Sequence, residues 1–500
     1  MKKISQKEQE KNELKKKDKK TKLIEFLYIN FSPRRMFSYF MIILIIYTFI
    51  QIKKFLIKDK ERNDPNINKN IIEDTEETEE ERFKNKVRLA IYYPPIQNEE
   101  INRITSILVN SMSKQSIFDL YLLLNSDFKN EDKINSTVHK LYINIHSSQV
   151  IRRKLLEYQI EMFIYQYYLP SDIKMLKKLE ELKGTKTIII NHFNFLYWLY
   201  NGDYEFFSEL YDIYKESKYI VSFIPFENYI LYKQWNFDTI FMNNIMPYDY
   251  NKITPSDLSS KTIIMIGQAS DKMKRFDLGI KAMKYIIKEI PDCEMKIISD
   301  LEGTEELKNL IKELNLEKNI KFEVNISSPE IYYEKASIHL FPSLTESSGL
   351  SLCETKIYGI PNILVGLDYL ACAKDGGVVN IYDDNPKTIA REAIKILKND
   401  TYRINLGKEA RESMKKYDND LIIDKWLRFI LCAYLDDNYY NRVKQEGNKT
   451  INLNVEKEIF NNQIKLLQKR IDGFKNIKES DIMDFNYMKK ILNKIKKLKE

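Results

Sequence analysis

Short apolar runs alternate with longer amphipathic stretches between residues 85 and 253. The runs with a strand pattern are VRLAIYYP at 87–94, FDLYLLLNS at 118–126, TIIIN at 187–191, YIVSFIP at 219–225 and DTIFMNN at 238–244. Helical patterns are expected at 101–114, at about 150–182 and at 203–216. Strands that alternate with helices predict a parallel sheet, so residues 85–253 are expected to form one doubly wound α/β domain.

The same alternation starts again after a polar segment, TPSDLSS at 254–260. Strands are expected at 261–267, 293–299, 320–324, 337–343 and 361–366, and helices at 276–291, 304–316, 328–336 and 349–359. Residues 254–435 therefore predict a second Rossmann-like domain, with a hinge near 250–260 and a ligand cleft between the two domains. Residues 436–500 are rich in Lys and Asn and show helical patches without an assignable motif.

One segment near the N-terminus has the pattern of a membrane span. Met36 to Ile52 is a run of 17 uncharged residues between basic clusters, and as a helix it would rise roughly 25 Å. Residues 1–35 carry 12 Lys and Arg, whereas residues 53–62 carry five. This asymmetry predicts a cytosolic basic tail and a single-pass type II membrane protein, in the Golgi or ER if the source is eukaryotic. Residues 53–84 include the acidic run EDTEETEEE and are expected to be a stem or linker.

Composition narrows the functional classes. The 500 residues are 43% hydrophobic and 30% charged, which is typical of a globular chain of two domains. The formal net charge of +8 is concentrated in the N-terminal tail, so no nucleic-acid partner is expected. The four cysteines are widely spaced and indicate neither a zinc site nor a disulfide framework. Four N-x-S/T sequons, at Asn135, Asn325, Asn399 and Asn448, are compatible with a lumenal domain.

The window Phe341 to Gly366, FPSLTESSGLSLCETKIYGIPNILVG, carries the strongest chemical signal. Glu346 lies in the loop after an expected strand, and Glu354 lies eight residues later inside the next expected helix. Both carboxylates could therefore face one ligand. The sequence SSG offers backbone N–H groups at the start of that helix, where oxygen-rich, negative ligands are favoured. By spacing alone, however, two glutamates are also compatible with an ordinary charged helix face.

This window resembles the E-x7-E element of retaining glycosyltransferases with the two-Rossmann GT-B fold, a family that includes sucrose synthases and many mannosyl- and glucosyltransferases. The resemblance covers about residues 261–426. It implies that Glu354 binds the ribose hydroxyls of a nucleotide-sugar donor and that Glu346 meets the donor sugar. It also implies that the backbone of Ser348, Gly349 and Leu350 meets sugar or phosphate.

The stretch IGQASDKMKRF resembles the first loop of the donor domain in the same family, where G-R and a later Lys neutralise the diphosphate. The match places Gly267 at the Gly, Lys274 at the Lys and Gln268 at the Arg. Gln268 departs from the family pattern because a neutral amide cannot offset phosphate charge. Either Arg275 substitutes for it or the diphosphate is held more weakly.

The first domain offers fewer signals. It lacks the glycine pair that often opens the first loop in this family, and His192 is its one candidate site residue, since it directly follows the strand TIIIN. His192 could contact the donor sugar or the acceptor, or it could be structural. His339 is expected in the core. No Asp-x-Asp motif with strand context is present, so neither a metal nor another cofactor is predicted.

The expected activity is transfer of a sugar from a UDP- or GDP-type donor to a hydroxyl of a glycan, lipid or protein acceptor, with retention of anomeric configuration. Three alternatives stay open at this point. They are a GT-B sugar-nucleotide epimerase, a membrane-tethered nucleotide-sugar binder without activity, and an interaction protein that uses its basic tail on anionic lipid.

Overall fold

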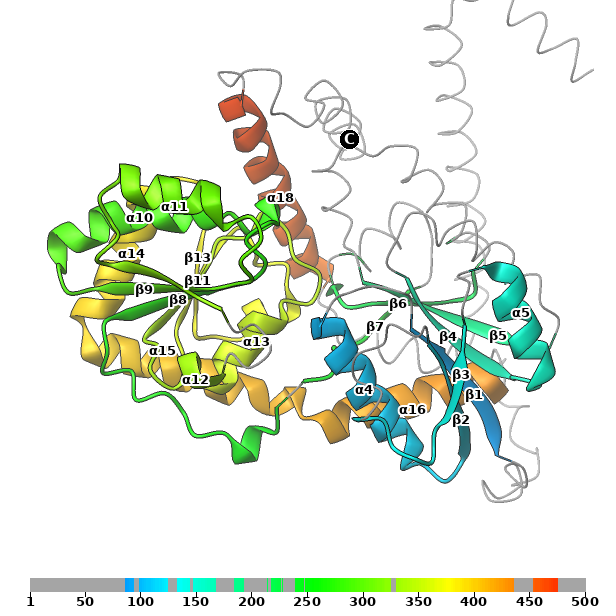
Figure 1. Ribbon diagram of the computed structural model, residues 1–500. Coiled ribbons are helices and arrows are strands. Elements are labelled where there is room, and N and C mark those ends of the chain that lie inside the picture. Colours follow the sequence, from blue (N-terminus) through cyan, green and yellow to red (C-terminus); the bar gives the residue numbers. More distant parts are fainter. Residues whose placement is uncertain are drawn as a thin grey trace, which may run out of the picture. The chain divides into compact units, whose positions relative to one another are not determined.

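Two parallel β-sheets dominate the part of the chain that the computed structural model describes (Figure 1). The described residues are 86–93, 99–124, 133–143, 147–167, 184–192, 214, 217–225, 227, 239–246, 248–324, 330–435 and 453–474. The chain divides into two compact units, residues 1–82 and 83–500, and all described residues belong to the second unit. The expected tail, membrane span and stem all lie outside the described residues. No helix among those that are described is long and apolar enough to cross a membrane.

The first sheet has seven strands in the order β3-β2-β1-β4-β5-β6-β7, and every neighbouring pair is parallel. Its strands are β1 Val87–Tyr92, β2 Phe118–Leu124, β3 His139–Tyr142, β4 Met162–Tyr167, β5 Lys186–Asn191, β6 Tyr219–Ser222 and β7 Thr239–Phe241. Helix α4 (Glu99–Ser113) packs on one face and α5 (Ser148–Glu157) on the other. Alternate residues of β1 point to the two faces: Leu89 joins the cluster with α4, and Ala90 joins the cluster with α5. Burial on both faces explains the continuous apolar runs.

The expectation of helical sequence over residues 150–182 was wrong for part of that range. Helix α5 ends at Glu157, Gln159 has a φ of 51°, and strand β4 follows between β1 and β5. The segment MFIYQY forms a strand because it is rich in aromatic and branched residues and lies in the middle of the sheet, buried on both faces. Strand β3 was also missed, because an edge strand with a single fully buried residue leaves little hydrophobic pattern.

The second sheet has six strands in the order β10-β9-β8-β11-β12-β13, and all its pairs are parallel. Its strands are β8 Thr262–Ile266, β9 Glu294–Ile298, β10 Ile320–Glu323, β11 Ile338–Phe341, β12 Asn362–Val365 and β13 Val378–Ile381. This is a doubly wound order. The order of the strands along the sheet reverses between β8 and β11. The strands expected from the sequence at 261–267, 293–299, 320–324, 337–343 and 361–366 are confirmed.

Helices cover both faces of the second sheet. Helices α10 (Phe276–Glu289), α11 (Thr304–Glu313) and α14 (Pro386–Lys398), labelled in Figure 1, share one apolar cluster with the sheet. Helices α12 (Glu330–Tyr333) and α13 (Leu350–Ile357) pack on the other face. Helix α15 (Asp400–Ser413) lies against α13, where Gly407 allows close approach to the carbonyl oxygen of Gly359. The second sheet and its helices therefore have the doubly wound α/β architecture that was expected.

Two further helices follow among the described residues. Helix α16 (Asn419–Leu435) ends against the first sheet, where Lys186 Nζ donates to the carbonyl oxygens of Ala433 and Tyr434 at 2.9 and 2.8 Å. These carbonyls at the end of the helix have no partner within the helix, and a cation beside them also interacts favourably with the helix dipole. Helix α18 (Leu453–Phe474) lies in the segment for which the sequence indicated only helical patches.

Gly377→Ala is expected to lower the free energy of unfolding more than Gly184→Ala does. Both glycines have a positive φ, +68° and +95°, so an alanine is strained at either position. A Cβ at Gly377 would lie 2.3 Å from Cα of Ala410, whereas a Cβ at Gly184 would meet nothing within 4 Å. Steric overlap should add about 1–3 kcal/mol at Gly377. Urea unfolding of the two variants measures the difference, and equal losses would contradict the steric contribution.

Candidate functional site

The candidate donor-binding residues gather at the carboxyl edge of the second sheet. Three loops meet at this edge: residues 267–275 after β8, residues 342–349 after β11 and residues 366–370 after β12. In open parallel sheets, ligands bind beyond the carboxyl ends of the strands, next to the point where the strand order reverses. That point lies between β8 and β11, so it is flanked by the first two of these loops.

Lys274 and Glu346 form an ion pair between the first two loops. Lys274 Nζ lies 2.7 Å from Glu346 Oε1, and the side chains are 23% and 12% exposed. The backbone of the two loops is also joined, because Leu344 N–H donates to the carbonyl oxygen of Met273 at 2.7 Å. Gly267 has a φ of +150°, and a Cβ there would lie 3.2 Å from the aliphatic part of Lys274. The glycine therefore leaves room for the lysine side chain to lie over the loop.

Tyr369 fixes the backbone of Glu346. Its hydroxyl accepts a hydrogen bond from Glu346 N–H at 2.8 Å and donates to the Glu346 carbonyl oxygen at 3.1 Å. Tyr369 is fully buried, so its ring cannot move without disturbing the core. The third loop thus determines where the carboxylate of Glu346 is presented.

Glu354 is buried on α13, and its two carboxylate oxygens have protein partners. Arg103 of α4 donates to Oε1, and Tyr333 of α12 donates to Oε2 at 2.7 Å. Burial raises the pKa of Glu354, although Arg103 and Tyr333 oppose this rise. The guanidinium of Arg103 also lies over the ring of Tyr248, 5.6 Å from its centroid. A ribose that binds Glu354 would therefore have to share the carboxylate with Arg103 or displace it.

The start of α13 provides backbone donors beside these carboxylates. Gly349 precedes the helix with a φ of +64°, and no side chain caps the first turn. A Cβ at Gly349 would lie 2.9 Å from Leu370, so glycine is required sterically as well as conformationally. Ser348 is held in place because Asn244 Nδ2 donates to its Oγ at 3.3 Å. Leu350 is buried, so its contribution to a ligand site is limited to its backbone.

Arg275 has a carboxylate partner rather than lying in a solvated loop. Its Nη2 is 2.7 Å from Asp384 Oδ1, and Asp384 also accepts two hydrogen bonds from Arg470. Burial lowers the pKa of the Arg275 guanidinium, and Asp384 opposes this shift. Burial alone would raise the pKa of Asp384, but Arg470 and Arg275 together hold it below its usual value. Gln268, at the family's arginine position, is exposed.

His192 lies at the carboxyl end of β5, as expected, in a polar network of the first sheet. Its Nε2 is 3.1 Å from Gln166 Oε1, and Gln166 Nε2 donates to Thr105 Oγ1 at 3.1 Å. Burial lowers the pKa of His192 to about 3. The imidazole is therefore neutral at pH 7, where it can exchange hydrogen bonds with a hydroxyl but cannot neutralise a phosphate.

The low pKa of His192 predicts an acid-sensitive fold. In the unfolded chain a histidine has a pKa near 6.5, so between pH 6.5 and about 3 the unfolded state binds a proton that the folded state does not. Stability should therefore fall as the pH is lowered through this window. His192→Gln keeps a hydrogen-bonding side chain and should lose less stability than wild type between pH 7 and pH 4. Urea unfolding at both pH values measures the difference, and an unchanged pH dependence would contradict the assignment.

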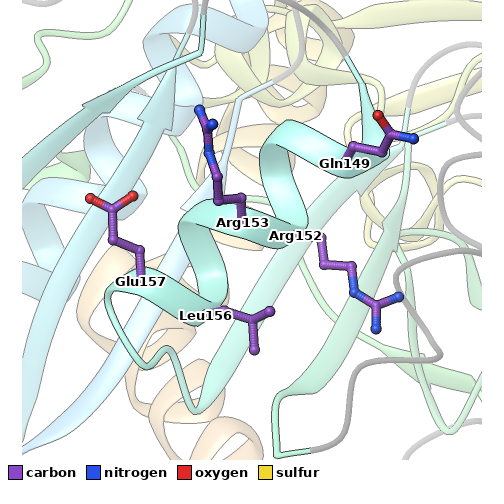
Figure 2. Close-up of a pocket in the computed structure, with 5 residues that line it drawn as sticks. All are labelled: Gln149, Arg152, Arg153, Leu156 and Glu157. Carbon is purple, nitrogen blue, oxygen red and sulfur yellow. The ribbon is translucent and has the colours of Figure 1, made fainter.

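The other candidate features do not belong to this site. Within the described ranges, no three His, Cys, Asp or Glu side chains form a cluster that could hold a metal ion. His339 is fully buried in β11, which confirms its place in the core. A surface hollow beside α5 has five lining residues among those described, all from that helix, as Figure 2 shows: Gln149, Arg152, Arg153, Leu156 and Glu157. None of the sequence-predicted donor-binding residues lines it.

Four residues of the site region carried no signal recognisable from the sequence. Arg103 and Tyr333 are separated from Glu354 by 251 and 21 residues, and Tyr369 and Arg470 act from a loop and a helix outside the E-x7-E window. Their roles follow only from the contacts that the fold creates.

Comparisons with known proteins agree with this geometry. A family model described as glycosyl transferases group 1 matches residues 249–413. The chain is 28% identical over 188 residues to an uncharacterized glycosyltransferase of Haemophilus influenzae, covering 37% of this chain and 52% of that protein. It is 26% identical over 171 residues to a poly(glycerol-phosphate) alpha-glucosyltransferase of Bacillus subtilis, covering 33% and 25%. The chain thus spans about half of the first relative and about a quarter of the second.

Solved structures agree on the fold. Sucrose-phosphate synthase from Thermosynechococcus elongatus superimposes with a TM-score of 0.58 at 13% identity, over 69% of this chain and 98% of that chain. At this identity the likeness shows the architecture alone. Residues 249–413 thus match the glycosyl transferases group 1 family, and the described part of the chain has a GT-B fold.

Proposed function

We propose that the protein is a glycosyltransferase that moves a sugar from a nucleotide-diphosphate sugar to a hydroxyl acceptor with retention of anomeric configuration. The observation that carries the proposal is the arrangement of Lys274, Glu346 and Glu354 around the start of α13, inside the glycosyl transferases group 1 domain. These residues provide a cation, two carboxylates and a set of backbone donors at one sheet edge. A sugar diphosphate requires such partners for its phosphates and its hydroxyls.

The expected division of labour follows from the chemistry of the transfer. As the sugar leaves the diphosphate, negative charge grows on the phosphate oxygens and positive charge on the sugar ring. Lys274 and the N–H groups at the start of α13 would stabilise the leaving diphosphate. Glu346 would lie beside the sugar, and Glu354 would bind the ribose. His192, being neutral, would contribute hydrogen bonds to the sugar or the acceptor. No protein nucleophile and no metal is proposed.

The test uses the full chain in detergent with UDP- and GDP-sugars and a panel of glycan, lipid and peptide acceptors. The expected result is release of nucleoside diphosphate together with a glycosylated product, whose anomeric configuration NMR compares with that of the donor. Nucleotide release without a glycosylated product would favour the epimerase alternative, and tight donor binding without turnover would favour a binder. An inverted product would overturn retention alone.

We also propose that residues 36–52 anchor the enzyme as a type II membrane protein, on the basis of their apolar run and the basic asymmetry around it. In sealed vesicles with the cytosolic face outward, added protease should leave the residues after the anchor intact until detergent is added. Digestion of those residues without detergent would overturn this topology.

A further inference from the structure

Helix α18, labelled in Figure 1, contacts the second domain through a seam of buried polar side chains, among them Gln463 and Arg470. Among the side chains of this helix that the structure describes, five are buried at alternating spacings of three and four, which is the spacing of one helix face: Glu456, Ile459, Gln463, Leu466 and Arg470. Three of the five are polar or charged. The helix lies beyond residues 249–413, so the matched family domain does not include it.

The first polar contact leads to the backbone of Glu346. Gln463 Nε2 donates to the carbonyl oxygen of Gly366 at 2.8 Å and to Asp368 Oδ1 at 2.7 Å. These two residues lie in the loop after β12, directly before Tyr369. The Tyr369 hydroxyl in turn makes both backbone hydrogen bonds to Glu346. One side chain of α18 therefore fixes the loop that positions the sugar-facing glutamate.

The second polar contact leads to the carboxylate of Glu346. Arg470, with a side chain 1% exposed, donates to both oxygens of Asp384 at 3.0 and 3.2 Å. Asp384 also binds Arg275 at 2.7 Å. Arg275 directly follows Lys274, and Lys274 pairs with Glu346. Two chains of contacts that start on one helix thus converge on the Lys274–Glu346 pair.

Packing alone does not account for this seam. Apolar residues of similar size would hold a helix on a domain at least as well, because burying charges costs several kcal/mol that their pairing only partly recovers. Buried polar groups that are hydrogen-bonded to one another, as Arg470 and Gln463 are to their partners, instead fix a single geometry. The seam therefore specifies where the loops after β8 and β12 lie, in addition to attaching the helix.

We propose that α18 is a positioning element of the donor site, and that Arg470 is the positioning residue that acts through Asp384 and Arg275 on Lys274. The inference rests on the proposed function, because the pair that it positions is assigned to the donor sugar and diphosphate. Arg470 does not touch the substrate. It holds the loop in the one arrangement in which the lysine and the glutamate can act together.

The kinetic test compares Arg470→Met with Arg470→Lys in the full chain, with and without Lys274→Ala. Arg470→Met should lower kcat about tenfold, since small displacements of catalytic groups have large effects on turnover. Arg470→Lys, which keeps a cation beside Asp384, should recover part of the loss. In the Lys274→Ala background, Arg470→Met should change kcat less than about twofold, because the group it positions is already absent. An equal loss in both backgrounds would show a general structural role and overturn the proposal.

A second test needs no activity, so it separates this inference from the proposed function. Hydrogen exchange of the unliganded protein should accelerate in residues 267–276 when Arg470 is replaced by Met. Arg403→Met is the matched control, since Arg403 is a buried arginine that donates to the carbonyl oxygens of Leu258 and Leu397, away from the pair. It should destabilise the domain without that selective acceleration. Faster exchange confined to residues 453–474 in Arg470→Met would overturn the proposal, whereas an inactive wild type with the expected exchange would overturn only the proposed function.

Discussion

Glu346→Ala should lower turnover about tenfold to a hundredfold, whereas Glu354→Ala should mainly raise the KM for the donor. A carboxylate beside the reacting sugar interacts more strongly with the transition state than with the ground state, and only such an interaction accelerates the reaction. Ribose contacts are the same in both states and contribute uniform binding. A charge-assisted hydrogen bond is worth about 1.5–3 kcal/mol, which sets the size of both effects.

Steady-state kinetics on both variants, with circular dichroism as a check of folding, decide this prediction. Glu346 forms an ion pair with Lys274 in the absence of donor, so Lys274→Ala is the informative companion. It should weaken binding of nucleoside diphosphate more than binding of nucleoside, because it removes a phosphate partner. If both glutamate variants keep wild-type kinetics, these carboxylates have only a structural role and the proposed function loses its main support.

Arg103→Met is expected to lower the free energy of unfolding at pH 7.5 by about 2–3 kcal/mol. The variant would leave the buried carboxylate of Glu354 with Tyr333 but without its cationic partner, and breaking a buried pair from one side is costly. This loss is smaller than the usual range of about 3–5 kcal/mol because the Arg103 side chain is 29% exposed and solvent screens the pair.

The loss should depend on pH in a defined direction. Burial already raises the pKa of Glu354, and removal of Arg103 should raise it further. Between the unfolded pKa near 4.3 and the higher folded value, the folded state binds the extra proton, so stability falls as the pH rises through this window. The loss of unfolding free energy in Arg103→Met, relative to wild type, should therefore be smaller at pH 5 than at pH 7.5. The double variant with Glu354→Gln should recover most of it at pH 7.5, and additive losses in the double variant would contradict a direct pair.

The sequence predicted the second domain more fully than the first. Its strands are short, buried on both faces and bounded by Gly, Pro and polar turns, so local pattern and tertiary environment agree. The E-x7-E window also placed Glu346 in a loop and Glu354 in a helix, as the structure does. In the first domain, by contrast, an aromatic strand next to a helix gave no periodic signal that separates the two, and β4 was missed.

Local pattern by itself determined the parallel α/β class, the order of the elements between Thr262 and Val365, and the identity of the residues at the carboxyl edge of the second sheet. These follow from the alternation of apolar and polar positions, which a strand or helix expresses without reference to distant residues. Only the tertiary structure decided which groups meet there. Arg103 reaches Glu354 across 251 residues, and Arg470 reaches Asp384 across 86. A salt bridge between residues so far apart leaves no periodic trace in one sequence, because its partners are brought together by the packing of whole sheets and helices.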